Sequence, residues 1–289
     1  MSVDTGAPPP KATQGNEDIA DTPSEFLVEF LTQLKATTSE NAPETTRTLV
    51  NQSLELATGL LTYPLAMSSG VSKDAQLLAN ETKAIDFEVL YNEGKTGSFK
   101  FFKEMSSDLL QGQILKMMVR MTGAKKVLEI GTFTGFAALN MAEGLPSDGK
   151  LVTMELLPFF AQFARDFFSR TPTGSKITVQ EGSAIDLLKN LAEKRESFDL
   201  IFIDAAKKDY KDYLQIILDS NILAPGGTML FDNTIFKGAT FMENFPNAAF
   251  ARGGPGVHNF NKILQNETRV EQVVLPISDG VTIVRRIGE

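Results

Sequence analysis

The chain after about residue 98 alternates short apolar segments with longer amphipathic ones, and this alternation limits the possible folds more than any other feature. The short segments are rich in β-branched residues, as is typical of strands buried on both faces of a sheet. They are Lys126–Ile130, Leu151–Met154, Ile177–Val179, Phe198–Ile203 and Gly227–Phe231. The segments between them have helical periodicity; they are Gly135–Gly144, Phe159–Arg170, Ala184–Lys194 and Tyr210–Ile222. We therefore predict an α/β domain over residues 98–289, with helices on both faces of a parallel sheet.

The C-terminal residues break this alternation. Two strand-like segments, Arg269–Leu275 and Gly280–Arg285, follow each other without a helix between them. An otherwise parallel sheet of this class often ends in antiparallel strands. The predicted fold is therefore a doubly wound, Rossmann-like sheet that is mostly parallel and has an antiparallel C-terminal strand pair.

The chain before residue 98 has a different character. Residues 1–22 are rich in Pro, Gly, Ala and Thr and poor in large apolar residues, so we predict a disordered tail. Residues 23–97 are predicted to form a helical extension. Its apolar positions between Phe26 and Leu61 lie at helical spacing, and their exposure would favour a homodimer.

Three helices are expected in this extension. The first follows Ser24, which is available as an N-cap, and the second covers about Thr45–Leu61 and ends before Pro64. The third covers about Ser72–Tyr91. We expect these helices to cover the catalytic domain or a partner subunit.

Composition excludes several kinds of function. The chain has no cysteine and one histidine, His258, which leaves almost no basis for a thiolate or histidine metal site or a Ser-His-Asp triad. Its formal charge of -8 opposes binding to nucleic acid or anionic membranes. An apolar run of about 18 residues is absent from the sequence, and neither a secretory signal nor a transit peptide is recognised. A cytoplasmic enzyme acting on a small molecule is the resulting expectation.

The first predicted strand leads into a glycine-containing turn. Gly131 and Gly135 are separated by three residues, so the pattern differs from GxGxxG, and Glu129 lies two residues before the first glycine. A carboxylate there would repel a pyrophosphate but suits the ammonium of a ligand that carries an amino acid. The pattern favours S-adenosylmethionine over a dinucleotide. A turn without a ligand remains an alternative.

Glu155 ends the second predicted strand. An acid at this place in a doubly wound sheet accepts hydrogen bonds from the ribose hydroxyls of a bound nucleotide. Its distance from the glycine turn favours that role over the alternative of a solvated surface carboxylate.

Polar residues also follow the fourth and fifth predicted strands. Asp204 follows the fourth strand, and Asp232 and Asn233 follow the fifth. The carboxyl ends of parallel strands share one edge, so these oxygen ligands would converge on a hard cation such as Mg²⁺. Turn chemistry alone is the alternative for Asp232 and Asn233. Lys207 can reach the same edge, where a divalent cation would favour its neutral form and let it act as general base.

These residues belong to a longer series of ordered blocks. Together the blocks resemble the cation-dependent class I O-methyltransferases, which include the caffeoyl-CoA and catechol O-methyltransferases. They are Met105–Ser107 with Gly112 and Gln113, Val127–Phe136, Glu181–Ala184, Phe198–Tyr213, Asp232–Thr234 and Leu275–Arg286.

This resemblance implies a role for each matching residue. Asp204, Asp232 and Asn233 would hold the cation, and Lys207 would be the general base with Asp204 beside it. S-adenosylmethionine would contact residues from several blocks, with Glu129 and Ser107 at its methionine part, Glu155 at its ribose, and Ser183 and Ala184 at its adenine. The full set of implied donor contacts is Met105, Ser107, Glu129, Gly131, Phe133, Ala137, Glu155, Gly182, Ser183, Ala184 and Asp204.

The sequence departs from the plant members of this family. Ala206 replaces an aspartate, Lys237 follows the Asp-Asn-Thr block where an asparagine is used for substrate, and residues 241–258 do not reproduce the loop for a CoA ester. The resemblance therefore implies a smaller acceptor, an aromatic vicinal diol. Three alternatives stay open: a nucleotide-binding oxidoreductase, which Glu129 opposes; a methyltransferase that uses Lys207 without a metal; and an inactive homologue that only binds the donor.

Overall fold

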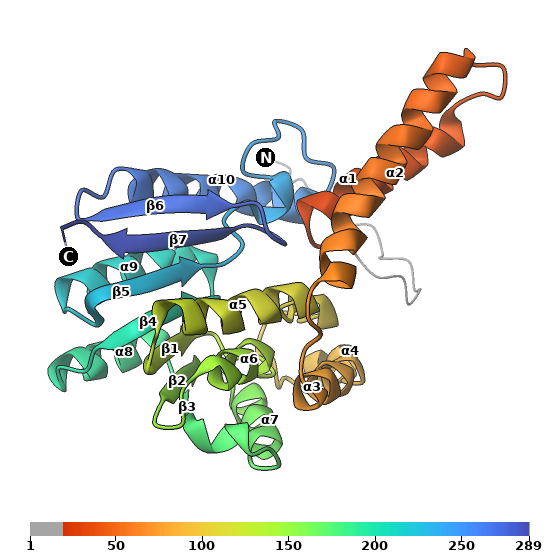
Figure 1. The fold of residues 1–289 in the computed structure, drawn as a ribbon. Helices are drawn as coiled ribbons and strands as arrows, with labels where there is room; N and C mark the ends of the chain where they lie inside the picture. Colours follow the sequence, from red (N-terminus) through yellow and green to blue (C-terminus); the bar gives the residue numbers. More distant parts are fainter. Residues whose placement is uncertain (1–19, 289) are drawn as a thin grey trace, which may run out of the picture.

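The computed structural model describes residues 20–288, and at their centre lies one seven-stranded sheet (Figure 1). The strand order is β3-β2-β1-β4-β5-β7-β6. Neighbouring strands from β3 to β5 are parallel, whereas β7 is antiparallel to both β5 and β6. The strands are β1 (Lys126–Ile130), β2 (Lys150–Glu155), β3 (Ile177–Glu181), β4 (Phe198–Ile203), β5 (Leu223–Phe231), β6 (Val270–Leu275) and β7 (Val281–Arg286). This topology confirms the predicted fold class.

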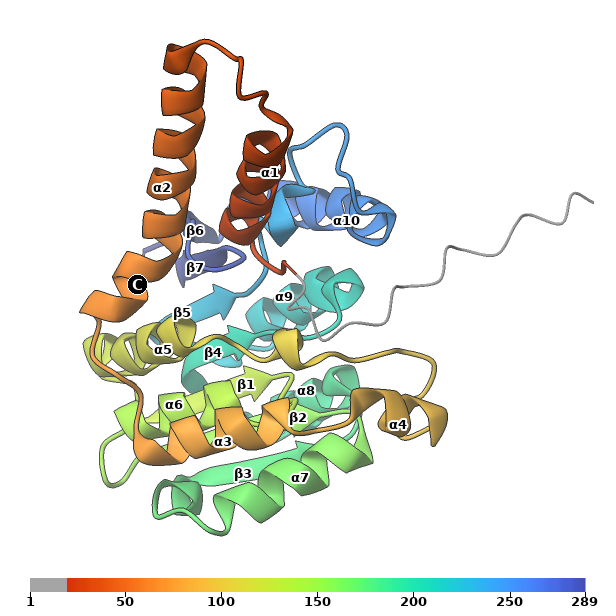
Figure 2. The same cartoon turned by 90° about the vertical axis from the view of Figure 1, so that its right-hand side faces the viewer.

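Helices cover both faces of the sheet, and a core lies on each side (Figure 2). On one face are α3 (Lys73–Lys83), α5 (Leu109–Thr122), α6 (Phe136–Gly144) and α7 (Pro158–Phe168). On the other face are α8 (Ala184–Glu193), α9 (Tyr210–Asp219) and α10 (Ala248–Gln265). Strand side chains alternate between the two cores: Val127 belongs to the first and Leu128 to the second, both fully buried. Short 3₁₀ segments complete the chain: η1 (Lys103–Met105), η2 (Thr173–Lys176), η3 (Lys207–Asp209) and η4 (Phe236–Gly238).

Two of these helices have no counterpart in the sequence-based prediction. Helix α5 carries Gly112 and an exposed Met117, and α10 contains the run from Gly253 to Gly256 with Pro255 inside it. Local propensity opposes a helix at such glycines and proline. Burial compensates in α10, because Phe260 and Leu264 pack into the core beneath it.

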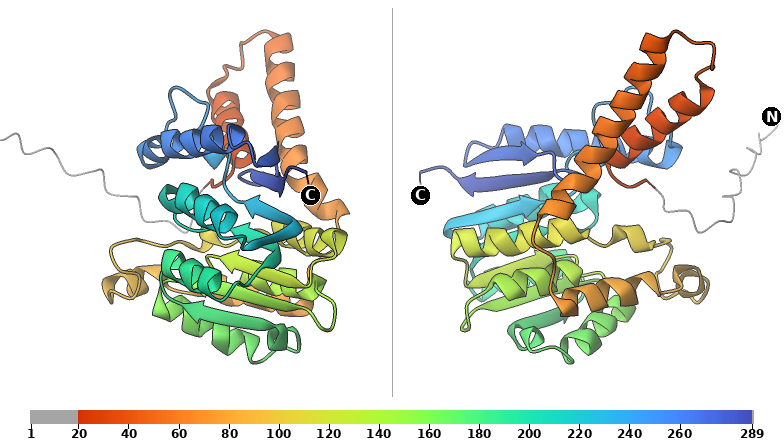
Figure 3. Two further views of the ribbon diagram at one scale, coloured as in Figure 1. Left: turned by 90° about the vertical axis from the view of Figure 1, so that its left-hand side faces the viewer. Right: turned by 45° about the vertical axis from the view of Figure 1, so that its right-hand side comes forward.

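The N-terminal extension begins with a helical hairpin of α1 (Pro23–Thr37) and α2 (Glu44–Met67), which projects from the sheet domain (Figures 1 and 3). The N-cap of α1 is Thr22 and not Ser24, because Thr22 and Glu25 form a reciprocal capping box. The predicted end of the second helix before Pro64 is also wrong. The helix continues to Met67, and its last turn is closed by bonds from Ser68 to the Pro64 carbonyl.

The predicted third helix is two helices, α3 and α4 (Phe87–Asn92). They separate at Asp86, whose side chain accepts a bond from the Val89 amide and starts a new helix. Ala75 and Leu78 of α3 belong to the core of the sheet domain. The domain boundary at residue 98 stays a prediction.

The predicted disordered tail falls mostly outside the described residues, which begin at Ala20. At the C-terminal end of that predicted tail, the main-chain amides of Asp21 and Thr22 both donate to Glu25 Oε2. Within residues 20–288, no helix is long and apolar enough to span a membrane.

Helix α2 carries an apolar stripe that faces solvent. The stripe consists of Leu49, Leu56, Leu60, Tyr63 and Met67, each 63 to 67% exposed. Its spacing of seven, four, three and four residues places these side chains along one line of the helix, as in a coiled-coil seam. A stripe of this kind is self-complementary across a two-fold axis. We therefore propose that the stripe joins two copies of this chain.

Light scattering of the full chain tests this proposal. We expect wild type to be a dimer and the double variant Leu56→Glu/Leu60→Glu to be a monomer of unchanged circular dichroism, because two buried charges would oppose the contact. Glu55→Gln, off the stripe on the same helix, should remain a dimer. A monomeric wild type at micromolar concentration would contradict the proposal.

Candidate active site

The turn after β1 is pressed against the end of β4. Gly131 has a φ of +100°, and a Cβ added to it would lie 1.9 Å from the main-chain oxygen of Asp204. Only glycine fits such an approach, because any side chain would collide with backbone that cannot move away. The close contact brings two predicted binding elements to one edge of the sheet. They are the glycine turn, predicted to bind S-adenosylmethionine, and the end of β4, predicted to bind the cation.

Glu129 of β1 is fully buried behind this turn. Its Oε2 accepts a hydrogen bond from the Thr153 hydroxyl, whereas its Oε1 has no hydrogen-bond partner among the described residues. Burial raises the pKa of this carboxyl well above its usual range, and the charges of Asp204 and Glu155 add to the effect. An unpaired buried carboxylate oxygen favours a cationic ligand, and the ammonium of an amino-acid group meets that requirement.

Glu155 ends β2 and is committed to the backbone. Its two oxygens accept bonds of 2.8 Å from the amides of Phe133 and Leu157. Burial nevertheless raises the pKa of Glu155. The ring of Phe133 is stacked between Phe87 and Phe101, with centroids 5.8 Å from each. The structure therefore places the Phe133 amide at the edge of the sheet and its ring in an aromatic cluster.

The three predicted cation ligands follow β4 and β5, which are adjacent and parallel. Asp232 is only 3% exposed and accepts a 2.8 Å bond from Gln111 Nε2. Burial raises the pKa of Asp232 to about 8, and the nearby charge of Asp204 is the second cause. The two carboxylates therefore lie close enough to repel each other.

These two carboxylates and the Asn233 amide are oxygen ligands of the kind that would suit a hard divalent cation that keeps waters or acceptor oxygens in its shell. Within residues 20–288, no cluster of three His, Cys, Asp or Glu side chains could hold a metal ion. A cation bound by Asp204 and Asp232 would therefore also need the Asn233 amide and oxygens from water or from an acceptor. The residues fit such a cation as a partial shell.

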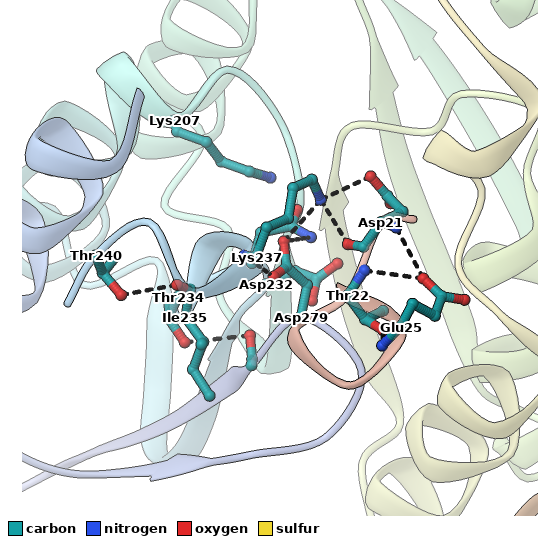
Figure 4. Close-up of polar contacts among 12 residues, drawn as sticks. Asp21, Thr22, Glu25, Lys207, Asp232, Thr234, Ile235, Lys237, Thr240 and Asp279 are labelled. Carbon is teal, nitrogen blue, oxygen red and sulfur yellow. Dashed lines mark hydrogen bonds and ion pairs between the residues drawn. The ribbon is translucent and has the colours of Figure 1, made fainter. Parts of the chain in front are cut away.

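Asn233 has a φ of +55°, and its Nδ2 donates a 3.1 Å bond to Asp279 Oδ2. The same oxygen accepts a 2.9 Å bond from Lys237 Nζ. Figure 4 shows the Lys237 ammonium between Asp279 and Asp21. The nitrogen of the amide that would bind the cation is thus fixed by Asp279, which Lys237 in turn holds in place.

The ammonium of Lys207 lies at the same edge. Its Nζ is 2.7 Å from Asp204 Oδ1 and 2.8 Å from the Tyr210 hydroxyl. That hydroxyl lies 3.1 Å from the carbonyl oxygens of Ile203 and Asp232. Lys207 is therefore in contact with Asp204, one predicted cation ligand. The Tyr210 hydroxyl connects it to the main chain of a second, Asp232.

The remaining predicted donor contacts are spread around this edge. Gly182, with a φ of +142°, follows β3, and its amide donates to the Glu155 carbonyl at 2.8 Å; Ser183 and Ala184 then start α8. Ala137 is buried in the first turn of α6. Met105 ends η1 and is 40% exposed, and Ser107 lies just beyond it. None of these positions adds a charge to the site.

Several side chains in contact with the predicted site residues were not predicted to act there, among them Thr153, Gln111, Tyr210 and Asp279. Lys237 contacts Asp279 in turn. Gln111 lies 121 residues from its partner Asp232, and Asp279 lies 46 residues from Asn233. Residue spacing carries no signal for contacts over such distances. Tyr210 and Asp279 lie inside blocks that carry the resemblance, and Lys237 was noted as a departure from the plant pattern, but none of the three was assigned a role in the site.

The fold and this acidic edge can be compared with known proteins. The model of the O-methyltransferase family matches residues 65–287. Caffeoyl-CoA O-methyltransferase 2 of Zea mays is 34% identical over 188 residues, which are 63% of this chain and 70% of that protein. Tricin synthase 2 of Oryza sativa subsp. japonica is 32% identical over 63% of this chain, and the match covers 64% of its own length.

Solved structures agree with these relatives. An SAH-bound methyltransferase of Podospora anserina has a TM-score of 0.70 and 28% identity, over 80% of this chain and 95% of that one. An O-methyltransferase of Streptomyces achromogenes, solved with SAM and involved in tomaymycin synthesis, has a TM-score of 0.60 and 26% identity. The match covers 78% of this chain and 95% of that one.

A Rossmann-like methyltransferase is thus the class that the sheet and the comparisons define together. The chain belongs to the O-methyltransferase family, in the group of the caffeoyl-CoA O-methyltransferases. The predictions of this family and of an S-adenosylmethionine-dependent O-methyltransferase are confirmed.

The contact at Gly131 can be tested by substitution. Gly131→Ala should lower the free energy of unfolding by about 3 kcal/mol, because it combines a disfavoured φ with a backbone collision. Gly70→Ala is the control, since no atom lies within 4 Å of its added Cβ. Urea unfolding measures both, and an unchanged midpoint for Gly131→Ala would show that the turn does not press on β4.

Proposed function

We propose that the protein transfers the methyl group of S-adenosylmethionine to one hydroxyl of a catechol-like aromatic diol, with the assistance of a divalent cation, most simply Mg²⁺. The observation that carries this proposal is the proximity of Asp204, Asp232 and the Lys207 ammonium, at the edge where Asn233 follows Asp232. Two carboxylates and an amide suit a cation whose remaining positions accept two neighbouring oxygens. A vicinal diol supplies such a pair.

The donor would lie along the glycine turn. The unpaired Oε1 of Glu129 supports a contact with the ammonium of its methionine part. Glu155 already accepts two main-chain amides, so a ribose hydroxyl would share its oxygens or replace one of these bonds. The turn at Gly182–Ala184 would border the adenine.

The reaction forms a C–O bond and breaks the donor's S–CH₃ bond, and the hydroxyl proton must leave. A bound donor supplies an electrophilic methyl group, and a bound cation would make the acceptor hydroxyls more acidic. Lys207 would hold or accept that proton at Nζ, and the contacts of Nζ with Asp204 Oδ1 and the Tyr210 hydroxyl support this role. Holding both reactants at one edge also supplies their orientation.

The environment of Lys237 supports a small acceptor. Several relatives are named for caffeoyl-CoA, whose CoA part carries phosphates. In this chain the Lys237 ammonium is only 7% exposed and is bound by Asp279 and Asp21, so its charge is already compensated. Its charge is therefore little available to a phosphate group of the acceptor.

Two alternative functions stay open: methyl transfer that uses Lys207 without a metal, and binding of the methyl donor without turnover.

The central test incubates the protein with S-adenosylmethionine and a panel of catechols, with Mg²⁺ or with EDTA. We expect transfer with Mg²⁺ and its loss in EDTA. Asp232→Asn should abolish transfer and leave donor binding unchanged by calorimetry, whereas Asp212→Asn, on the surface of α9, should behave as wild type. Transfer that survives EDTA would remove the metal, and donor binding without transfer to any diol would favour the inactive homologue.

The role of Lys207 is tested separately. Lys207→Met should lower kcat by about 10²- to 10⁴-fold, because the hydroxyl proton loses its acceptor. Lys208→Met changes the neighbouring exposed lysine and should retain wild-type kcat. Full activity of Lys207→Met across the pH range would rule out this lysine as the base.

A further inference from the structure

A buried polar chain links the start of the N-terminal extension to the candidate cation site (Figure 4). Its four members are Asn233, Asp279, Lys237 and Asp21. Asp279 Oδ2 accepts both Asn233 Nδ2 and Lys237 Nζ, and the same Nζ lies 2.8 Å from Asp21 Oδ1 and 2.8 Å from the Asp21 main-chain oxygen. These contacts bring together residues 216 positions apart in the sequence.

The middle of this chain is closed to water. The side chains of Lys237 and Asp279 are only 7% and 4% exposed. Asp279 Oδ1 also accepts the main-chain amide of Lys237, whose φ of +60° is unusual for a lysine. A buried charge that loses its partner is strongly destabilising, so each member fixes the position of the next.

Asp279 determines which way the Asn233 amide faces. A carboxylate accepts hydrogen bonds but cannot donate them, so it selects the nitrogen end of the amide. The amide oxygen then points to the other side, which is the orientation that a cation ligand requires. Asp279 is therefore a positioning residue for Asn233.

Asp21 supplies the remaining compensation for Lys237. With Asp21 absent, the buried ammonium would keep only Asp279, and part of its positive charge would oppose a cation at the neighbouring Asp232 and Asn233. Asp21 is itself held in place, because Glu25 Oε2 accepts its main-chain amide at 2.8 Å. Phe26 follows and packs against Ala239 and Phe245, which lie after β5.

We propose that residues 20–26 form an N-terminal strap whose docking on Lys237 through Asp21 stabilises the arrangement of Asp279 and Asn233 that binds a divalent cation. The inference rests on the proposed function only for the existence of the cation site. Strap docking and cation binding then favour each other by the same factor, since coupling between two binding events is reciprocal.

The first experiment titrates Mn²⁺ into the full chain, with S-adenosylhomocysteine present, by calorimetry. Asp21→Asn should weaken Mn²⁺ binding by about fivefold or more, the lower end of ordinary coupling. Asp21→Glu keeps the charge and should recover most of the affinity. Glu29→Gln removes one charge from the exposed face of α1, where Glu29 accepts a hydrogen bond from Gln33, and should match wild type.

The second experiment follows hydrogen exchange in residues 20–37 and needs no catalysis. Mn²⁺ should slow exchange there in wild type and Glu29→Gln, and should have little effect in Asp21→Asn. Circular dichroism establishes that each variant is folded.

The outcomes separate this inference from the proposed function. If wild type binds Mn²⁺ and Asp21→Asn binds it equally well, the strap is only a structural tether and the inference is wrong while the proposed function stands. If wild type binds no Mn²⁺ and transfers methyl groups in EDTA, the cation site itself is refuted, and the inference with it.

Discussion

The repulsion among acidic side chains at one edge of the sheet is the constraint on which the rest of the site depends. Glu129, Glu155, Asp204 and Asp232 come from the ends of four neighbouring strands and the start of the turns beyond them, and burial raises the pKa of three of them. Main-chain amides, Gln111 and Lys207 compensate part of this charge. What is left, including the unpaired oxygen of Glu129, is what a cationic donor and a divalent cation would satisfy.

The N-terminal extension combines two different roles in a short length of chain. The hairpin of α1 and α2 projects from the sheet domain and exposes an apolar stripe, whereas the residues just before α1 are held next to the acidic edge by Lys237. Helix α3 goes further and contributes Ala75 and Leu78 to the core. The proposed dimer contact and the proposed link to the site therefore both fall in one segment outside the predicted catalytic domain.

Errors in the predicted elements have local causes. The strands were found because a strand buried on both faces needs continuous apolar, β-branched residues. Helix α10 was missed because the run from Gly253 to Gly256 opposes a helix locally, and only burial of Phe260 and Leu264 compensates. Pro64 did not end α2, since a proline near the end of a helix removes only the bond from its own nitrogen to the preceding turn, and Ser68 closes the turn that follows by donating to the Pro64 carbonyl.

The sequence by itself determined the fold class, the family and the charged residues of the edge, because strand ends and the glycine turn are local patterns and parallel strands must end together. Only the tertiary structure decided how those charges are compensated. Gln111 reaches Asp232 across 121 residues, and Asp21 reaches Lys237 across 216. Such contacts depend on how distant elements pack, and burial, which makes each unpaired charge costly, is a property of the folded chain alone.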